Sequence, residues 1–216
     1  MKNSEVYKWF GDFFEKRGFN KHGRYIVKMG SISAFSFSFE CTNTNSVYFR
    51  YAFLPLFVPT DYIDYAYGGR LEQIASGHTS LTMPYETESS IKEWIELVKT
   101  TVDSHILPVF KEIENPYILQ SLLLNGRPII FKGSILRHYK LLIYLCVMLG
   151  DDPKSISQLF NKAIKEINKS HISDSLKFEF EAEIKDLISI KFNSADERII
   201  YFQRIIEITK QKIFGL

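Results

Sequence analysis

The amino-acid sequence predicts an α+β fold, in which an N-terminal helix packs on a three- to four-stranded antiparallel meander and an all-helical region follows. Apolar residues first recur at helical spacing, then alternate with polar residues, and return to helical spacing from Ser90 onward. We expect an αβββ unit over residues 1–85 and a helical region over residues 86–216. No linker rich in Gly, Pro or Ser separates the two, so we expect one continuous body.

The first element is predicted to be an amphipathic helix. Its apolar residues have the three- and four-residue spacing of a buried stripe, and they are Val6, Trp9, Phe10, Phe13 and Phe14. Gly18 can adopt the left-handed conformation that ends a helix, and Phe19 can then pack back on the last turn. We therefore expect the helix to end just before Gly18.

The next segment has the alternating pattern of antiparallel strands. A short strand is expected over residues 24–29, and Phe35, Phe37 and Phe39 then alternate with polar residues. The polar residues 42–46 suit a hairpin turn, after which aromatic residues alternate again up to Phe53. A sheet with one aromatic face needs a cover, and we expect the apolar stripe of the first helix to provide it.

From Ser90 onward the pattern is helical. Ser90 and Glu93 form the capping box of a helix, and Pro108 is expected either to kink this helix or to start a new one. Further helices are expected from Asn115, from Ser134, from Asp152, over residues 174–191 and from Ser194. The helix that follows Ser134 is apolar nearly all round, which is typical of a central helix. The last helix carries more isoleucines than one stripe needs, so either the bundle surrounds it or a second subunit covers it.

Composition and charge exclude several classes of protein. With 45% hydrophobic and 24% charged residues, the chain has the composition of a folded protein. The formal net charge is +2, and neither half has the positive excess that a nucleic-acid surface needs. Cys41 and Cys146 lie in apolar patterns and are expected to be reduced core residues. There is no apolar leader and no run near the roughly 20 residues that span a bilayer. We expect a cytoplasmic protein without a nucleic-acid or membrane partner.

The sequence has no pattern typical of a metal, cofactor or catalytic site. The five histidines lack metal-ligand spacing, and there is no CxxC, HExxH or EF-hand pattern. Gly68 and Gly69 lack the further glycines of a phosphate-binding loop and favour a simple turn. No serine lies in the G-x-S-x-G pattern of hydrolases. We therefore expect no metal, no cofactor and no catalytic residues.

Residues 61–70 are the densest group of chemically versatile side chains. Two carboxylates, three tyrosines and an arginine occur there. Such residues suit acid–base chemistry, and Tyr and Arg are also favoured at protein interfaces. A third interpretation is that the tyrosines pack under the sheet while the acids face solvent. The candidate binding residues are Asp61, Tyr62, Asp64, Tyr65 and Arg70.

Several short motifs resemble a bacterial family. The motifs are Lys16-Arg17-Gly18-Phe19-Asn20-Lys21, Gly23-Arg24-Tyr25, Leu54-Pro55, Gly69-Arg70-Leu71 and Ile106-Leu107-Pro108-Val109-Phe110. Over roughly residues 5–125 they are similar to the domain of unknown function 4304. The resemblance implies a small cytoplasmic protein encoded near bacterial polymorphic toxins, where such proteins serve as immunity factors. It implies no catalytic residues and does not extend into the helical C-terminal half.

These observations leave three hypotheses about function. The leading one is a non-enzymatic protein-binding module, with an immunity or toxin-antagonist protein as one form of it. The second is an enzyme or small-molecule binder that uses Asp61, Asp64 and Tyr65 at the sheet edge. The third is a scaffold that forms a homodimer through the last helix. A concave pocket at residues 61–70 would favour the second hypothesis, and a flat or convex surface the first.

Overall fold

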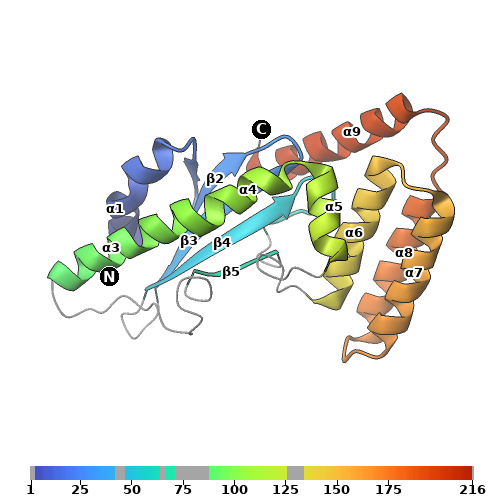
Figure 1. Ribbon diagram of the computed structural model, residues 1–216, viewed down its shortest axis with the longest axis horizontal. Coiled ribbons are helices and arrows are strands. Elements are labelled where there is room, and N and C mark those ends of the chain that lie inside the picture. The colour runs from blue at the N-terminus through green and yellow to red at the C-terminus, as the bar shows by residue number, and fades with distance from the viewer. Residues whose placement is uncertain (1–2, 42–46, 64–66, 72–87, 126–133, 216) are drawn as a thin grey trace.

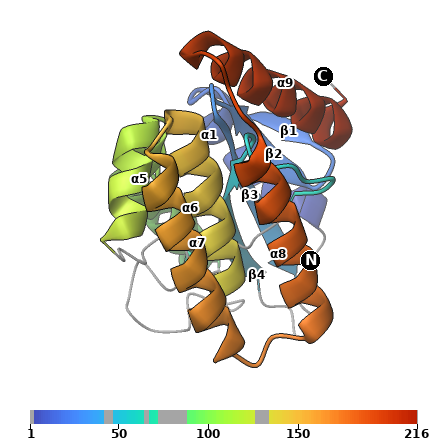
Figure 2. The same cartoon turned by 90° about the vertical axis from the view of Figure 1, so that its right-hand side faces the viewer.

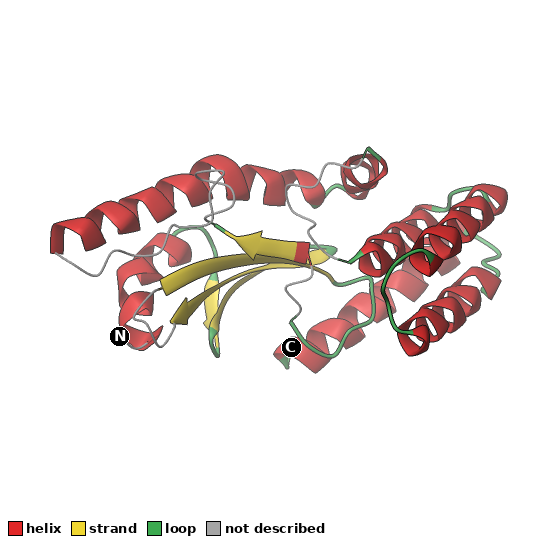
Figure 3. Cartoon of the chain, turned by 90° about the horizontal axis from the view of Figure 1, so that it is seen from below, coloured by secondary structure: helices red, strands yellow, loops and turns green. Residues whose placement is uncertain are grey.

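The computed structural model describes residues 3–41, 47–63, 67–71, 88–125 and 134–215 (Figure 1). Within them the fold is α+β, as predicted: one helix, a five-stranded antiparallel sheet, and then helices up to the C-terminus. Figure 3 shows helices that run along the sheet and a further group of helices beyond one of its ends. Buried apolar residues from both regions, from Val6 to Phe202, belong to one contiguous core.

Helix α1 (Asn3–Glu15) packs on the sheet through the predicted stripe. The stripe has three fully buried members, Val6, Phe10 and Phe14, and two half-buried ones, Trp9 and Phe13. The helix ends as the sequence predicts, because Gly18 has a φ of 78° and the amide of Phe19 donates to the carbonyl of Phe14 at 3.0 Å. The rings of Phe14 and Phe19 are 5.6 Å apart, so Phe19 does pack back on the last turn.

The sheet contains five strands that pair in chain order. They are β1 (Asn20–His22), β2 (Tyr25–Met29), β3 (Ser33–Cys41), β4 (Val47–Pro55) and β5 (Gly68–Arg70). The long pair β3–β4 places Phe37 opposite Tyr51, so the aromatic residues of both strands share one face. Strand β1 was not expected, because three residues are too few to show alternation. The predicted hairpin turn, residues 42–46, lies outside the described residues.

The simple turn expected at Gly68 and Gly69 is wrong. These residues belong to β5, where Gly68 lies opposite Ala52 and Gly69 opposite Tyr51. A Cβ atom at Gly68 would lie 2.0 Å from the carbonyl oxygen of Tyr51, so a larger residue would separate the strands. Gly68 therefore allows β5 to approach β4 closely, and it does not form a turn.

The aromatic face of the sheet has a second cover that the sequence analysis did not assign. Helix α3 (Glu88–Thr101) continues through the π-helical turn η2 (Val102–Ile106) into α4 (Leu107–Ile113), as Figure 1 shows. Phe110 of α4 stacks on Phe35 with 4.2 Å between ring centroids, and Trp94 of α3 meets Phe10 edge-on at 5.7 Å. The first helix and this long helix therefore share the aromatic face.

Two sequence signals in the long helix have different outcomes. The helix begins at Glu88, before Ser90, so the expected capping box at Ser90 and Glu93 does not mark its start. The change expected at Pro108 is confirmed, because Pro108 lies in the first turn of α4 directly after the π-helical turn. A proline is tolerated there, since the first turn of a helix needs no N–H donor from it.

The remaining helices follow the predicted boundaries. They are α5 (Pro116–Leu124), α6 (Ile135–Leu149), α7 (Pro153–Asn168), α8 (Asp174–Ser189) and α9 (Ala195–Phe214). The side chains of Asn115, Ser134, Asp152 and Ser194 cap four of them by accepting hydrogen bonds from backbone amides. Helix α6 is buried over most of its length, as expected for a central helix, and it packs against α5, α7 and α8.

Helix α9 lies at one end of the group formed by α6, α7 and α8 (Figure 2) and contacts α6. Its end covers the second face of the sheet, where Phe214 packs with Val27, Leu54 and Leu56. Ile199, Ile200 and Ile208 are exposed by 49%, 64% and 44%. The expectation that the bundle surrounds this helix is therefore wrong, because these isoleucines stay exposed, although Phe202 on another side of the helix is buried in the main core.

Candidate functional site

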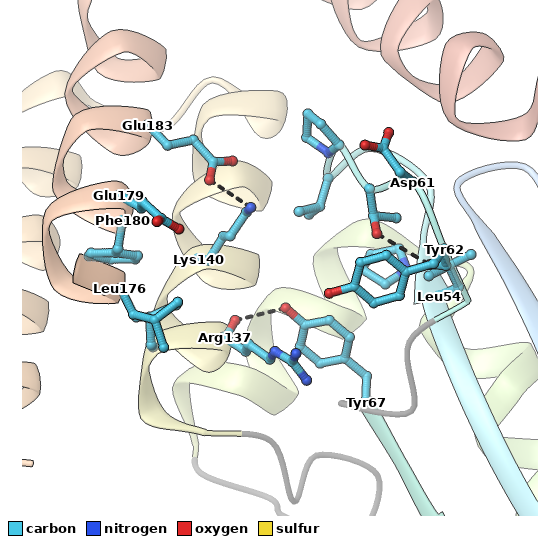
Figure 4. Close-up of a pocket in the computed structure, with 15 residues that line it drawn as sticks. Leu54, Asp61, Tyr62, Tyr67, Arg137, Lys140, Leu176, Glu179, Phe180 and Glu183 are labelled. Carbon is cyan, nitrogen blue, oxygen red and sulfur yellow. Dashed lines mark hydrogen bonds and ion pairs between the residues drawn. The ribbon is translucent and has the colours of Figure 1, made fainter. Parts of the chain in front are cut away.

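A pocket of about 360 Å³ lies where the sheet meets the helical group (Figure 4). The sheet side of the pocket is the end of β4 and the segment that follows it, residues 54–62, together with Tyr67. The helical side is the first half of α6 and the inner face of α8. Three segments that are distant in the sequence therefore form the walls.

The sheet side is fixed by the turn after β4. The amide of Leu56 donates to the carbonyl of Ile32 at 2.9 Å, and Val58 donates to Pro55 at 3.2 Å, so the chain turns tightly before it reaches the pocket. Tyr67 is buried, and its hydroxyl donates to the backbone carbonyl of Arg137 at 2.9 Å. This hydrogen bond joins the start of β5 to the first turns of α6.

The helical side contains an ion pair between Lys140 and Glu183, in which each oxygen of the carboxylate has a partner. The Lys140 ammonium lies 2.7 Å from Oε2 of Glu183, and the Tyr144 hydroxyl donates to Oε1 of the same carboxylate at 2.7 Å. Burial, and then the charge of Glu183, raises the pKa of Tyr144 well above its ordinary value. Tyr144 therefore stays protonated near neutral pH and acts as a donor. Both oxygens of Glu183 are engaged, one by a cation and one by a hydroxyl.

Glu179 lies one helical turn before Glu183 on α8 and also lines the pocket. Its Oε1 accepts a hydrogen bond of 3.2 Å from the Ser175 hydroxyl. Among the described residues, no Lys, Arg or His forms an ion pair with Glu179. Figure 4 shows Glu179, Phe180 and Glu183 together on one wall of the pocket, with Lys140 between them and the sheet.

The pocket combines charges of both signs with apolar surface. Asp61, Glu179 and Glu183 are the carboxylates that line it, and Arg137 and Lys140 are the cations. The lining therefore has one more formal negative charge than positive charges. Apolar side chains complete the walls, and they are Leu54, Val58, Leu136, Leu176 and Phe180. No group of His, Cys, Asp and Glu among the described residues has an arrangement that could bind a metal ion.

The structure separates the five candidate residues of the segment 61–70. Asp61 and Tyr62 lie at the mouth of the pocket, where Tyr62 is 60% exposed and Asp61 pairs with Lys212 of α9 at 2.7 Å. Arg70 lies elsewhere, on β5, with its guanidinium 4.0 Å over the ring of Tyr48 and 3.7 Å from Glu40. Asp64 and Tyr65 lie outside the described residues.

The helical residues of the pocket were not predicted from the sequence. Two spacings were available as signals: Lys140 and Tyr144 are four residues apart, and so are Glu179 and Glu183. Positions four apart lie on the same face of a helix, so each pair presents two polar groups in one direction. Lys140 is also a charge that directly precedes the long apolar run of α6. Nothing in the sequence indicates that the two pairs face each other.

Comparison with known proteins gave no assignment: no family model, curated protein or solved structure matches this chain. Within the described residues there is also no helix with the length and hydropathy required to span a membrane.

Proposed function

We propose that this chain is a binding protein whose pocket takes a small organic cation, a primary amine or a guanidinium group on a short apolar body. The observation that carries this proposal is the carboxylate of Glu179, which lines a concave pocket and has no cationic partner among the described residues. The volume of about 360 Å³ is within the range of small-molecule sites. The concave surface at residues 61 and 62 favours this class over a flat protein interface.

The neighbouring charges point to Glu179 as the recognition group. Glu183 is neutralised by Lys140, and Asp61 is paired with Lys212 at the mouth. A ligand cation therefore meets Glu179, the lining carboxylate that has no ion pair among the described residues, in a pocket that Arg137 also lines. A charge-assisted hydrogen bond to this carboxylate is stronger than a neutral one. Glu179 is an exposed residue of α8, so its interaction with a cation should weaken as the salt concentration rises.

The remaining walls suit the other parts of such a ligand. Leu176 and Phe180 lie on the same helix as Glu179 and offer apolar surface to a short alkyl chain. The exposed ring of Tyr62 lies across the pocket (Figure 4), where its face can attract a cation. The pocket thus presents an anionic group, an apolar wall and an aromatic ring to one small molecule.

The polar groups of the pocket favour binding over catalysis. Lys140 and Glu183 hold each other at 2.7 Å, and Tyr144 is kept protonated by its raised pKa. A general base or nucleophile needs a lone pair that can reach the substrate. The Lys140 ammonium has none, and the oxygens of Glu183 accept from Lys140 and Tyr144. We therefore propose a ligand-binding role without a chemical step.

Titration calorimetry with matched ligands tests the proposal. We expect n-butylguanidinium to bind the wild-type chain and butyrate not to bind. Replacing Glu179 by Gln keeps the shape and removes the charge, so we expect affinity to fall roughly tenfold or more. Glu181→Gln is the matched control, since Glu181 lies on the same helix and pairs with Lys185 outside the pocket. Equal affinity in the Glu179→Gln variant and the wild type would contradict the proposal.

A second candidate is a protein partner that inserts a Lys or Arg side chain into the same pocket. The exposed Tyr62 and the half-exposed Leu176 at its mouth favour this, because exposed aromatic and apolar residues around a pocket are typical of interface hot spots. The immunity role that the family resemblance implies would be of this kind. We expect Tyr62→Ala to abolish capture of such a partner and Arg70→Ala to leave it unchanged. Loss of capture in Arg70→Ala but not in Tyr62→Ala would show that the partner binds at β5 and not at the pocket.

A further inference from the structure

A second pocket lies on the aromatic face of the sheet, at the corner that follows α1. It has a volume of about 430 Å³ and is formed by this corner, the end of β2 and one face of α4. The α4 side supplies Leu107, Phe110, Lys111 and Glu114, whose spacing of three, four and seven residues places them on one helical face. The π-helical turn lies directly before Leu107, and such turns are frequent at functional sites.

The interior of this second pocket is apolar and aromatic. Phe19, Met29, Phe35, Leu107 and Phe110 line it. Phe35 and Phe110 stack on each other with 4.2 Å between their centroids and close the base of the pocket. Neither of these rings can reorient without disturbing the core, because both are almost fully buried. The pocket is therefore a preformed apolar site, not a gap that a side-chain rotation would close.

Of the four charged residues around this pocket, Arg17 is fully paired, whereas Glu114 is paired through Oε2 only and its buried Oε1 has no hydrogen-bond partner among the described residues. The Arg17 guanidinium makes two hydrogen bonds of 2.6 Å to the Asp103 carboxylate and a third, of 2.7 Å, to the carbonyl of Phe13. Oε2 of Glu114 accepts hydrogen bonds from the amide and the hydroxyl of Ser31, at 2.7 and 2.9 Å. Both side chains are thus held in place as walls.

Lys28 and Lys111 are the cations of the lining that remain available to a ligand. The Lys28 ammonium donates one hydrogen bond of 2.9 Å to the carbonyl of Arg17 and keeps two further N–H donors. Neither lysine forms an ion pair with a carboxylate of the described residues. Lys28 on β2 and Lys111 on α4 are exposed residues of the lining, and with Arg17 paired to Asp103 they outnumber the Glu114 carboxylate by one positive charge, which favours an anion.

We propose that this second pocket binds an amphipathic anion: a carboxylate whose apolar chain or ring lies on Phe35 and Phe110 while its oxygens meet Lys28 and Lys111. Burial of apolar surface supplies most of the affinity, at about 25 cal/mol per Å². The two lysines fix the orientation and exclude cations of the same shape. This site is independent of the proposed cation pocket and shares no lining residue with it.

Calorimetry with decanoate below its micelle concentration tests this inference, with decylammonium as the ligand of opposite charge. We expect decanoate to bind and decylammonium to bind at least roughly tenfold more weakly. Lys111→Glu should weaken decanoate roughly tenfold or more, because it replaces an attraction by a repulsion. Lys92→Glu is the matched control, since Lys92 is exposed on the same long helix, pairs with Glu88 and lies outside the pocket.

A second variant separates the pocket from adventitious surface binding. Leu107 is half-buried and lines the empty volume, so Leu107→Trp should fill the site and abolish decanoate binding. Thermal melts of each variant check that the fold is intact, and the exposed Lys111→Glu variant carries the test if Leu107→Trp does not fold. Equal binding of decanoate and decylammonium, or an equal effect of Lys92→Glu and Lys111→Glu, would overturn the inference. Glu179→Gln should leave decanoate binding unchanged.

Discussion

At the scale of single residues, Phe37 lies at the centre of the aromatic core. It is fully buried, and its ring centroid lies 4.8 Å from Phe14, 5.2 Å from Phe19 and 5.3 Å from Phe49. These rings belong to α1, the following corner and β4, so Phe37 joins three parts of the αβββ unit. Its removal would leave a cavity that none of these neighbours can fill.

We therefore predict that Phe37→Ala lowers the free energy of unfolding by about 3–5 kcal/mol, as for other buried phenylalanines. Urea denaturation measures this directly. Leu124→Ala is the control, because Leu124 is 60% exposed and should change stability by no more than about 0.5 kcal/mol. A loss below about 1 kcal/mol for Phe37→Ala would mean that this face of the sheet is not core.

Cys146 gives a second prediction at this scale. Burial raises the pKa of its thiol from 9.0 to about 12. Between these values the thiol ionises in the unfolded chain but not in the folded one, so unfolding releases a proton and stability falls as pH rises. We predict that the loss of stability between pH 8 and pH 10 is smaller in Cys146→Ala than in the wild type. Identical losses in urea melts would show that the thiol is not buried as described.

The site illustrates what single residues reveal before a structure is known. Asp61 and Tyr62 were identified because they lie in a dense cluster of polar and aromatic residues, and they do line the pocket. Arg70 belongs to the same cluster but lies on the sheet with Tyr48, because strand pairing turns it away. Glu179 was not predicted, because its four-residue spacing from Glu183 also occurs on ordinary solvated helices and does not show that helix packing places it in the pocket.

At the scale of elements, the junction between α6 and α7 depends on Gly150. This residue ends α6 with a φ of 79°, and a Cβ atom there would lie 2.3 Å from the Arg198 guanidinium. The same guanidinium donates to the carbonyl of Met148 at 3.1 Å, so it ties α9 to the end of α6. A side chain at position 150 would disturb both the backbone and this contact.

We predict that Gly150→Ala destabilises the protein by roughly 1–2 kcal/mol, the usual cost of a left-handed conformation for a residue with a Cβ. Gly11→Ala is the control, and its expected effect on stability has the opposite sign. Gly11 lies within α1 with nothing within 4 Å of its Cβ position, so alanine should stabilise the helix by about 0.5–1 kcal/mol. Thermal melts of the two variants should therefore shift in opposite directions, and shifts of the same sign would contradict this account.

The elements that were predicted are those with a strong local signal. Capped helices such as α7, and long alternating strands such as β3 and β4, agree with the sequence because propensity, spacing and capping coincide. Strands β1 and β5 have three residues each and form because a neighbouring strand pairs with them. A local sequence pattern does not predict such pairing. Helix α3 begins before its expected cap, where the exposed Glu88 and Ser89 interact with Lys92 and Glu93 one turn further along the helix.

At the scale of the whole molecule, the two faces of the sheet have different covers. The helices α1, α3 and α4 cover the aromatic face, and the end of α9 covers part of the other. The sequence predicts one aromatic face and one covering helix, but periodicity alone does not say which of the later helices return to the sheet. The contact between Asp61 and Lys212 also joins α9 to the mouth of the pocket.

The exposed isoleucines of α9 keep the predicted homodimer open to test. Ile200 and Ile208 lie on the solvent side of the last helix and are exposed by 64% and 44%. If a second subunit covers them, sedimentation equilibrium should show a mass twice that of the 25.2 kDa chain. Ile200→Asp should then restore the monomer, because a buried unpaired carboxylate is costly. A wild-type chain that stays at 25.2 kDa at the highest concentration would exclude this dimer.

The most direct test of the central claim is to locate a bound cation by nuclear Overhauser contacts. The account predicts contacts from the methylene protons of n-butylguanidinium to the side chains of Leu176 and Phe180, and to the ring of Tyr62. These residues come from α8 and from the segment after β4, so their joint observation would place the ligand between the sheet and the helical group. Contacts to Leu107 or Phe110 instead, or no contacts at millimolar ligand, would contradict the proposal.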